Sequence, residues 1–249
     1  EGIAKAHQIG ARWEEVVGKS VAAHCRPLGI RAEVLEIEVD SPVWSQQLQL
    51  RKPELLAALK KTRQEENTIV IFTSDHGYHL GEQGLWTKAN NYELSTRVPL
   101  ILAVPGQENP GSITDALVEL VDIYPTLVEA CGLEAAQGVE GTSLMPLLKK
   151  PNRPWKTAVF SQYPRSHKGH RHSGHGDIMG YAVRTKKYRY VEWREWKTGS
   201  ILARELYDQR LAPSEMHNIA GVKGQAGVVN RLEKILAGGW RALPSVNGR

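Results

Sequence analysis

The sequence has few cysteines and no long hydrophobic run. Its 249 residues include two cysteines, Cys25 and Cys131, which form no metal-binding or redox motif. They therefore neither require nor exclude an oxidising compartment. No run approaches the roughly 18 apolar residues of a membrane-spanning helix, so we expect no membrane partner. No signal peptide begins at Glu1 and the chain does not start with Met, so we expect a fragment.

The composition that is present indicates a folded globular protein. The formal net charge is +5 and 41% of the residues are hydrophobic, which is typical of neither disordered nor membrane proteins. The length allows one large domain or two modest ones. We expect Lys186, Lys187, Arg189 and Arg194 to form a basic face that is solvated surface rather than a nucleic-acid stripe, because it lacks interleaved aromatic stacking at regular spacing.

The chain is organised around residues 67–106. A short β-branched apolar run at 68–72 is typical of a strand buried on both faces of a parallel sheet. Ser74-Asp75-His76-Gly77 follows at once, and a second strand is predicted over 98–104. Because ligands bind at the carboxyl ends of strands in open α/β sheets, Asp75 and His76 are site candidates.

The adjacent acid and imidazole predict metal ligands or a catalytic pair, and a plain turn after a strand is the alternative. Lys88 and Arg97 lie nearby in the sequence, and His79 and Glu82 add two titratable groups. A strand end with several cations and one acid suits an anionic substrate held against a divalent metal.

Several motifs in this region resemble the type I sulfatases. Residues 73–106, TSDHGYHLGEQGLWTKANNYELSTRVPLILAVPG, are similar to the C-terminal half of that family. They are most similar to its iduronate-2-sulfatase branch, in which the metal pair is Asp-His. The resemblance continues to about Gly221, through motifs at 115–127, 161–165, 179–185 and 205–208, and at Asn218.

This resemblance implies a calcium-dependent hydrolase of sulfated sugars or other sulfate esters. In the family, four metal ligands and a formylglycine nucleophile surround one sulfate. Asp75 and His76 fall on the second pair of metal ligands. Lys88 falls on the lysine that binds the sulfate oxygens and steadies the leaving group. Further substrate-binding candidates are Tyr78, His79, Arg97 and Arg165.

The other half of the family's catalytic pattern is missing from this chain. The formylglycine cysteine, a first metal pair of two adjacent Asp, and further catalytic Lys and His lie upstream in the family, yet this sequence contains no Asp-Asp pair. The nucleophile signal is Cys-x-Pro-x-Arg, and the run that starts at Cys25 has Gly29 where Arg is required. We therefore assign no nucleophile and expect the chain alone to be inactive.

Residues 1–61 resemble a different family, the DciA-like proteins, which are tied to loading of the replicative helicase. The matching residues are 13–18, 24–27, 35–39 and 41–48. The apolar pattern predicts a helix over 6–23, a strand over 31–39 and a helix over 42–59. The resemblance implies a small K-homology-like fold and a helicase or DNA partner. A gene fusion, a recombined gene or an assembly artefact would all produce the junction near 57–66.

The predicted fold class is α/β. We expect a partial alkaline-phosphatase-like (sulfatase) sheet with a small C-terminal antiparallel subdomain, preceded by the α+β segment. The predicted domains are residues 1–61, 62–155 and 156–249. Within them the patterns predict a helix over 113–131 capped by Gly132, a strand over 158–163 and a hairpin over 179–193. They also predict a short strand that begins at 206–208 and a helix over 230–240.

Four histidines occur within residues 166–175. A metal-binding loop is one interpretation. We favour a polar loop near the substrate entrance, suited to an acidic sugar, because glycine-rich spacing fixes no coordination geometry.

Three functions remain open. The chain is a sulfatase portion with half of a metal site, a DciA-like helicase-interaction protein with an inert sulfatase remnant, or a catalytically dead structural fragment. Sulfatases are usually exported and DciA-like proteins are cytoplasmic, so the localisation is left open.

Overall fold

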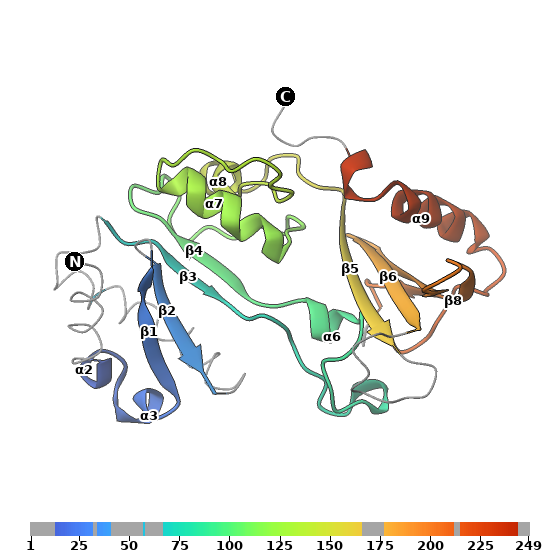
Figure 1. The fold of residues 1–249 in the computed structure, drawn as a ribbon, viewed down its shortest axis with the longest axis horizontal. Coiled ribbons are helices and arrows are strands. Elements are labelled where there is room, and N and C mark those ends of the chain that lie inside the picture. Colours follow the sequence, from blue (N-terminus) through green and yellow to red (C-terminus); the bar gives the residue numbers. More distant parts are fainter. Residues whose placement is uncertain are drawn as a thin grey trace. The chain divides into compact units, whose positions relative to one another are not determined.

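The structure, a computed structural model, describes residues 13–31, 34–40, 57, 67–165, 177–211 and 215–243. The chain divides into two compact units (Figure 1). One comprises Glu1–Asp75 with Val98–Gly111, and the other comprises His76–Arg97 with Ser112–Arg249. The two units are described one at a time.

The first unit begins with two short helices and a strand pair. Helices α2 (Trp13–Val17) and α3 (Lys19–Ala22) are separated at Gly18, where φ is 81°. The predicted helix over 6–23 is therefore interrupted in its described part. Strand β1 (Cys25–Arg31) pairs antiparallel with β2 (Val34–Val39). Most of the helix predicted over 42–59 lies outside the described residues.

The sequence patterns predict no strand over the range of β1, which contains Pro27. The ladder between β1 and β2 is irregular between Pro27 and Gly29. Strands accept proline at such bulges, where no ladder hydrogen bond is lost.

The core of the first unit joins these helices to a later strand. Trp13, Val17, Val21 and Cys25 are buried together, and Phe72 packs against them. The Trp13 Nε1–H donates to the Cys25 carbonyl oxygen at 2.7 Å. Burial, followed by the nearby Asp40 charge, raises the pKa of the Cys25 thiol, which keeps it in the unreactive thiol form.

The strand that carries Phe72 differs from the prediction in its pairing. Strand β3 (Val70–Thr73) pairs antiparallel with β4 (Leu100–Ala103), and every residue of both strands is only half-buried. The prediction of a strand buried on both faces of a parallel sheet is therefore wrong for the described residues. A parallel pair needs a crossover connection that is usually a helix, whereas only one-turn helices lie between β3 and β4.

The second unit is built on a four-stranded antiparallel sheet. Its strands are β5 (Ala158–Arg165), β6 (Ile178–Thr185), β7 (Tyr188–Glu195) and β8 (Ile201–Asp208), which lie in sequence order. The predicted strand over 158–163 and the hairpin over 179–193 are confirmed. The strand predicted to begin at Leu206 exists, but it begins five residues earlier, at Ile201, and ends at Asp208. A turn at Lys186-Lys187 joins the two strands of the hairpin.

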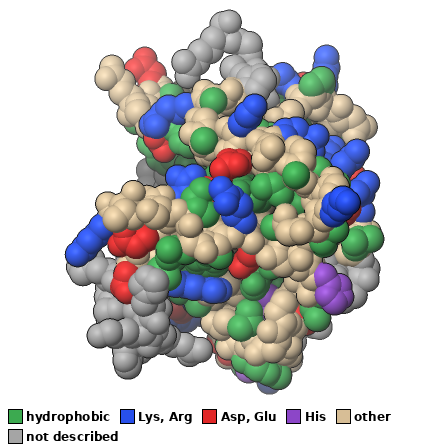
Figure 2. All heavy atoms as spheres, turned by 90° about the vertical axis from the view of Figure 1, so that its right-hand side faces the viewer, with side chains coloured by type: hydrophobic (Ala, Val, Ile, Leu, Met, Phe, Trp, Pro, Cys, Tyr) green, Lys and Arg blue, Asp and Glu red, His purple; other side chains and the backbone are tan. Residues whose placement is uncertain are grey.

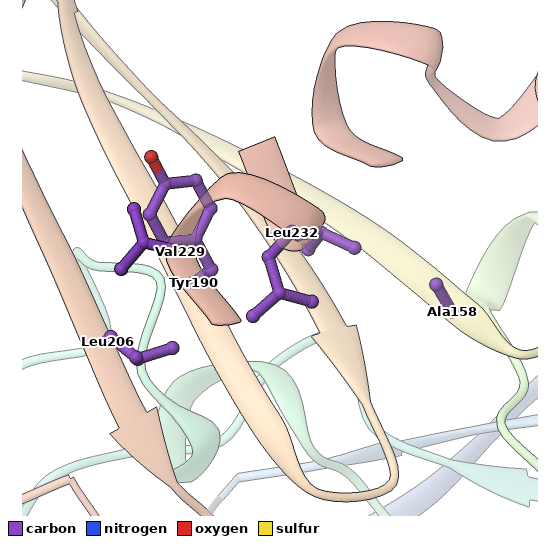
Figure 3. Packing of buried hydrophobic residues seen from close by; sticks show 6 residues of the cluster. Ala158, Tyr190, Leu206, Val229 and Leu232 are labelled. Carbon is purple, nitrogen blue, oxygen red and sulfur yellow. The ribbon is translucent and has the colours of Figure 1, made fainter. Parts of the chain in front are cut away.

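One face of this sheet is covered by helix α9 (Ala226–Gly238). Val183, Tyr190 and Leu206 are cross-strand neighbours on that face, and Val229 and Leu232 of α9 pack onto them (Figure 3). The predicted helix over 230–240 is confirmed in type but starts four residues earlier.

A second helical region precedes the sheet. It contains the 3₁₀ turn η3 (Leu120–Asp122), helix α7 (Ile123–Ala130) and helix α8 (Met145–Lys149). The helix predicted over 113–131 thus starts near Leu120, because Glu119 and Asp122 form a capping box that ends the extended chain before it. Gly132, with φ of 65°, closes the helix as predicted.

The expected basic face is not a single face. Arg189 and Arg194 lie an odd number of positions apart on β7, so they project from opposite sides of the sheet. Arg189 is 3% exposed and ion-paired. Figure 2 shows Lys and Arg dispersed among apolar and polar atoms rather than in one stripe. Among the described helices, none is long and apolar enough to cross a membrane.

Substituting Leu232 tests the core under α9. Leu232 is fully buried, so we expect Leu232→Ala to lower the free energy of unfolding by about 2–5 kcal/mol through lost burial and a residual cavity. Urea denaturation measures this change. Leu202→Ala removes the same atoms from an exposed position on β8 and should leave stability nearly unchanged. An equal loss in both variants would contradict the core assignment.

Candidate functional site

Most of the candidate site residues lie on one segment of the second unit, residues 76–97. The segment contains only the 3₁₀ turn η2 (Glu82–Gly84) and helix α6 (Glu93–Thr96). Because it has so little regular structure, side-chain hydrogen bonds and ion pairs must fix its conformation. Asp75, which precedes it directly, is exposed and belongs to the first unit.

The structure brings His76 and Lys88 together. The Lys88 Nζ lies 2.5 Å from the His76 Nε2, and the His76 Nδ1 lies 2.7 Å from the Gly77 carbonyl oxygen. A carbonyl only accepts, so Nδ1 carries the proton and Nε2 presents its lone pair. The ammonium donates to that lone pair. His76 is therefore arranged as an electron-pair donor to a cation.

Gly77 sets the position of this pair. A Cβ atom at residue 77 would lie 1.9 Å from the Leu94 carbonyl oxygen, so only glycine permits the close approach. The Gly77 N–H donates to the Ser95 carbonyl oxygen at 2.9 Å. These contacts anchor the backbone next to His76 against α6.

The neighbouring candidates Tyr78 and His79 face different environments. Tyr78 is exposed, and its hydroxyl donates to the Trp86 carbonyl oxygen at 3.1 Å. His79 is fully buried, and its ring meets the Tyr92 ring edge-on with 5.8 Å between centroids. Tyr78 is thus accessible to a ligand here, whereas His79 is covered by its own segment.

The two remaining candidates are engaged away from His76. The Arg97 guanidinium lies 3.7 Å from the Glu93 carboxylate and is largely exposed. Arg165, at the end of β5, stacks over the Trp193 ring at 4.2 Å from its centroid. Their roles as substrate contacts stay predictions.

A buried ion-pair cluster, which sequence reasoning missed, fixes the segment to the sheet. Glu93 accepts from Arg184 Nε at 3.0 Å and from Arg189 Nη2 at 2.5 Å. Arg189 Nε also donates to the Glu215 carboxylate at 2.6 Å. We call Glu93, Arg184, Arg189 and Glu215 the ionic cluster. Its two carboxylates balance its two guanidiniums, so burial leaves no net charge.

The cluster controls the ionisation of Glu93. Burial alone would raise the pKa of Glu93, but the hydrogen bonds and charges of Arg184 and Arg189 outweigh it and hold the pKa below its usual range. The carboxylate is therefore ionised at neutral pH. No sequence motif marks the cluster, because its members are spread from residue 93 to residue 215.

Asn91 adds a second attachment to the same face of the sheet. Its Nδ2 donates to the Gly180 carbonyl oxygen at 3.1 Å, and its Oδ1 accepts from the Ser161 hydroxyl at 3.1 Å. A Cβ at residue 180 would lie 2.8 Å from the Asn91 Nδ2 and closer still to the Trp193 ring. Gly180 therefore lets the segment approach the sheet.

The described residues contain no complete metal site. Asp75 offers carboxylate oxygens and His76 an imidazole nitrogen, but no group of three or more His, Cys, Asp or Glu in the described ranges could hold a metal. Calcium takes six to eight oxygen ligands. The His-rich loop at 166–175 lies outside the described residues.

Two known protein families match this chain, each over a different part of it. The family described as N-sulphoglucosamine sulphohydrolase, C-terminal, matches residues 81–239. The chain belongs to this sulfatase family. The DciA family (Dna[CI] antecedent) matches residues 2–71. Both resemblances inferred from the sequence motifs are thereby confirmed.

Curated sulfatases match the same region. The N-acetylglucosamine-6-O-sulfatase of Bacteroides thetaiotaomicron is 32% identical over 73% of this chain and 32% of its own length. The iduronate 2-sulfatase of Mus musculus is 31% identical over 72% of this chain and 43% of its own length. The chain thus spans less than half of these relatives.

Solved structures show the same architecture. A protein in complex with its substrate D-glucosamine-2-N,6-O-disulfate superposes with a TM-score of 0.64 and 29% identity, over 77% of this chain and 38% of that one. The phosphonate monoester hydrolase of Agrobacterium radiobacter has a TM-score of 0.64 and 27% identity, over 77% and 39%. The sulfatase fold is therefore confirmed for the matched portion.

Replacing Glu93 tests whether the ionic cluster holds the sulfatase segment in place. Glu93→Gln leaves two buried guanidiniums with one carboxylate, so we expect a loss of about 3–5 kcal/mol in the free energy of unfolding at pH 7. The folded-state pKa is depressed. Hence the stabilisation is present above the unfolded value of about 4.3 and is lost as pH falls through the folded value. The wild type and Glu93→Gln should converge in acid.

Urea denaturation between pH 7 and pH 3 measures that difference. Glu140→Gln is the control, because it breaks the surface ion pair to Arg241 and should change stability by less than about 1 kcal/mol. A difference between wild type and Glu93→Gln that stays constant with pH would contradict the assigned ionisation.

Proposed function

We propose that this chain is the C-terminal portion of a sulfuric ester hydrolase of the iduronate-2-sulfatase type. Asp75 and His76 supply half of a calcium site, and Lys88 binds the sulfate. The contact between His76 and Lys88 carries the proposal, because it joins a metal-type imidazole to an anion-type ammonium on one segment. The iduronate 2-sulfatase relatives support the choice of branch.

His76 is suited to a divalent cation. Metal-bound histidines usually donate their other ring N–H to a carbonyl or carboxylate, which fixes the tautomer. The His76 Nδ1 to Gly77 carbonyl bond is of that kind. The exposed Asp75 carboxylate comes immediately before it in the chain. Calcium bound there would neutralise charge on the sulfate oxygens. No third His, Cys, Asp or Glu in the described ranges joins Asp75 and His76 in a metal-holding group.

Lys88 has two alternative partners in this proposal. Here its ammonium donates to the His76 Nε2. When His76 binds a cation, that lone pair is taken, and the exposed Lys88 can direct its three N–H donors to an anion. An ammonium at this place stabilises negative charge as it develops on the sulfuryl and leaving-group oxygens.

The relatives indicate the chemical class of the substrate and not its identity. Two of the relatives are named for sulfated glucosamines, an N-acetylglucosamine-6-O-sulfatase and a protein solved with D-glucosamine-2-N,6-O-disulfate. We propose that the substrate is a sulfated sugar when an N-terminal half completes the active site. The exposed Tyr78 and Arg165 are the candidates for contacts to the sugar.

A second candidate function rests on the match to DciA over residues 2–71. Its described part forms a core around Trp13 that continues through Phe72. Through this segment the chain would bind a replicative helicase or DNA. A helicase pull-down that depends on residues 1–61, together with absent calcium binding at His76, would favour this function.

We predict little or no sulfatase turnover by the purified chain. The nucleophile and the first metal pair are absent, and two metal ligands cannot organise the attack on sulfur. Release of the phenol from an aryl sulfate, with and without calcium, measures this. The arylsulfatase K of Rattus norvegicus is a positive control for the assay conditions. Calcium-dependent hydrolysis by the chain alone would refute the prediction.

We predict weak calcium binding that acts on the His76 ring. Calcium should shift the ¹⁵N resonance of Nε2 much more than that of Nδ1, because Nδ1 remains bonded to Gly77. NMR of ¹⁵N-histidine-labelled protein measures both nitrogens. His76→Ala should remove the response, and His217→Ala, at an exposed position, should retain it. An unchanged His76 ring at millimolar calcium would overturn the metal assignment.

A further inference from the structure

Two backbone hydrogen bonds fold the segment around Lys88 back on itself. The His79 N–H donates to the Thr87 carbonyl oxygen, and the Gly81 N–H donates to the Leu85 carbonyl oxygen, each at 2.9 Å. The chain therefore runs antiparallel to itself, and the even-numbered residues between these positions also lie opposite one another in pairs. We call residues 78–88 the site loop.

The two faces of the site loop differ in exposure. Successive side chains of an extended chain point to opposite faces. His79, on the odd-numbered face, is fully buried. On the even-numbered face, Tyr78, Leu80 and Trp86 are 42%, 65% and 68% exposed, and Lys88 is exposed as well. Trp86 and Lys88 therefore lie two positions apart on one accessible face.

The turn of the site loop is held by side-chain hydrogen bonds. The Glu82 carboxylate accepts from the Leu80 N–H at 2.7 Å, and this bond holds the pKa of Glu82 below its usual range. The Gln83 Nε2 donates to the carbonyl oxygen of Glu215 at 3.3 Å. The turn is thus attached to a residue of the ionic cluster and does not hang free.

The position of Trp86 on this loop is also fixed. The Tyr78 hydroxyl donates across the loop to the Trp86 carbonyl oxygen at 3.1 Å. The Trp86 ring lies beside Gly81, where a Cβ would be 3.7 Å from the ring. The loop therefore presents a large aromatic side chain to solvent on a backbone that is held from both sides.

An exposed indole near an ammonium suits a sugar that carries a sulfate. The face of an aromatic ring is electronegative, and the C–H groups of a sugar ring, which are polarised by the neighbouring oxygens, pack against such a face. The Lys88 ammonium offers charge-assisted N–H donors to sulfate oxygens. Residues two positions apart in an extended chain are separated by about 6–7 Å, so one sulfated sugar can reach both side chains.

We propose that Trp86 is a sugar-binding residue whose ring stacks against the sugar that carries the sulfate bound at Lys88. The proposal rests on the proposed function, which assigns the sulfate to Lys88. Its own content is the ring contact, which favours a cyclic sulfate ester over inorganic sulfate and does not depend on a bound metal.

Binding of three small probes by the full chain tests the ring contact. The probes are N-acetylglucosamine 6-sulfate, the same sugar without the sulfate, and inorganic sulfate. NMR of ¹⁵N-labelled indole groups reports on Trp86, whose Nε1–H resonance is assigned from its absence in Trp86→Phe. We expect the sulfated sugar to shift this resonance strongly, the unsulfated sugar to shift it less, and inorganic sulfate to leave it in place.

Variants of Trp86 separate stacking from other effects. Trp86→Ala should weaken binding of the sulfated sugar about fivefold or more and leave the affinity for inorganic sulfate unchanged. Trp86→Phe keeps a ring and should retain most of the affinity. Trp196→Ala is the matched control, because Trp196 is 58% exposed and lies outside the site loop, and it should bind the sugar as the wild type does.

Three results would overturn the ring contact. The first is a Trp86 resonance that responds to neither sugar at tens of millimolar. The second is equal affinity of the wild type and Trp86→Ala for the sulfated sugar. The third is an equal loss in Trp86→Ala and Trp86→Phe, which would assign the contact to the indole N–H. Thermal melting of Trp86→Ala should match the wild type, since the side chain is exposed.

This proposal and the proposed function fail in different ways. Trp86-dependent binding that is equal for both sugars and unchanged in Lys88→Gln would support the ring contact and refute the sulfate role of Lys88. A shift of the Lys88 side-chain resonances by inorganic sulfate, with no response of Trp86 to either sugar, would refute the ring contact and retain the sulfate site.

Discussion

The ionic cluster of Glu93, Arg184, Arg189 and Glu215 is the interaction on which the site depends. The segment that carries His76 and Lys88 has almost no regular secondary structure, so its own backbone cannot hold two side chains 2.5 Å apart. The cluster ties that segment to β6 and β7 with bonds of 2.5–3.0 Å. Desolvating four charges is costly, and the balance of two acids against two guanidiniums offsets much of that penalty. The gain is a fixed geometry rather than a large net stability.

Buried charged groups also attach η3 to the sheet. Lys156 joins the acidic groups of Glu119 and Asp122, and a Glu119 carboxylate oxygen accepts from the Phe160 N–H of β5 at 2.9 Å. Both irregular segments are therefore attached to the antiparallel sheet through buried charge. Helix α9 is attached mainly through its apolar core, with one partly exposed ion pair from Glu233 to Arg204 of β8. The apolar attachment supplies stability, and the ionic attachments select one position for each segment.

Sequence patterns predicted the elements that depend on local periodicity. The alternation from Met179 to Trp193 and the Gly132 cap each depend on neighbouring residues, and both were confirmed. The prediction that β3 lies in a parallel sheet was wrong, because an apolar run does not reveal the direction of the neighbouring strand. Arg189 was placed on the surface because no local pattern reveals Glu215 as its partner. In the site, motif resemblance identified His76 and Lys88, but the bond that joins them and the Gly77 contact that positions them required coordinates.

In the proposed function, the His76–Lys88 bond would oppose metal binding by this portion alone. An imidazole lone pair satisfied by an ammonium is already stabilised, so a cation must displace that bond before it can bind. Two protein ligands give little free energy for the displacement, whereas a full shell of oxygens gives much more. In the proposed function, further ligands from the rest of a sulfatase would couple metal binding at His76 to the release of Lys88 toward an anion. Completing the shell would therefore create the cation site and the sulfate site together.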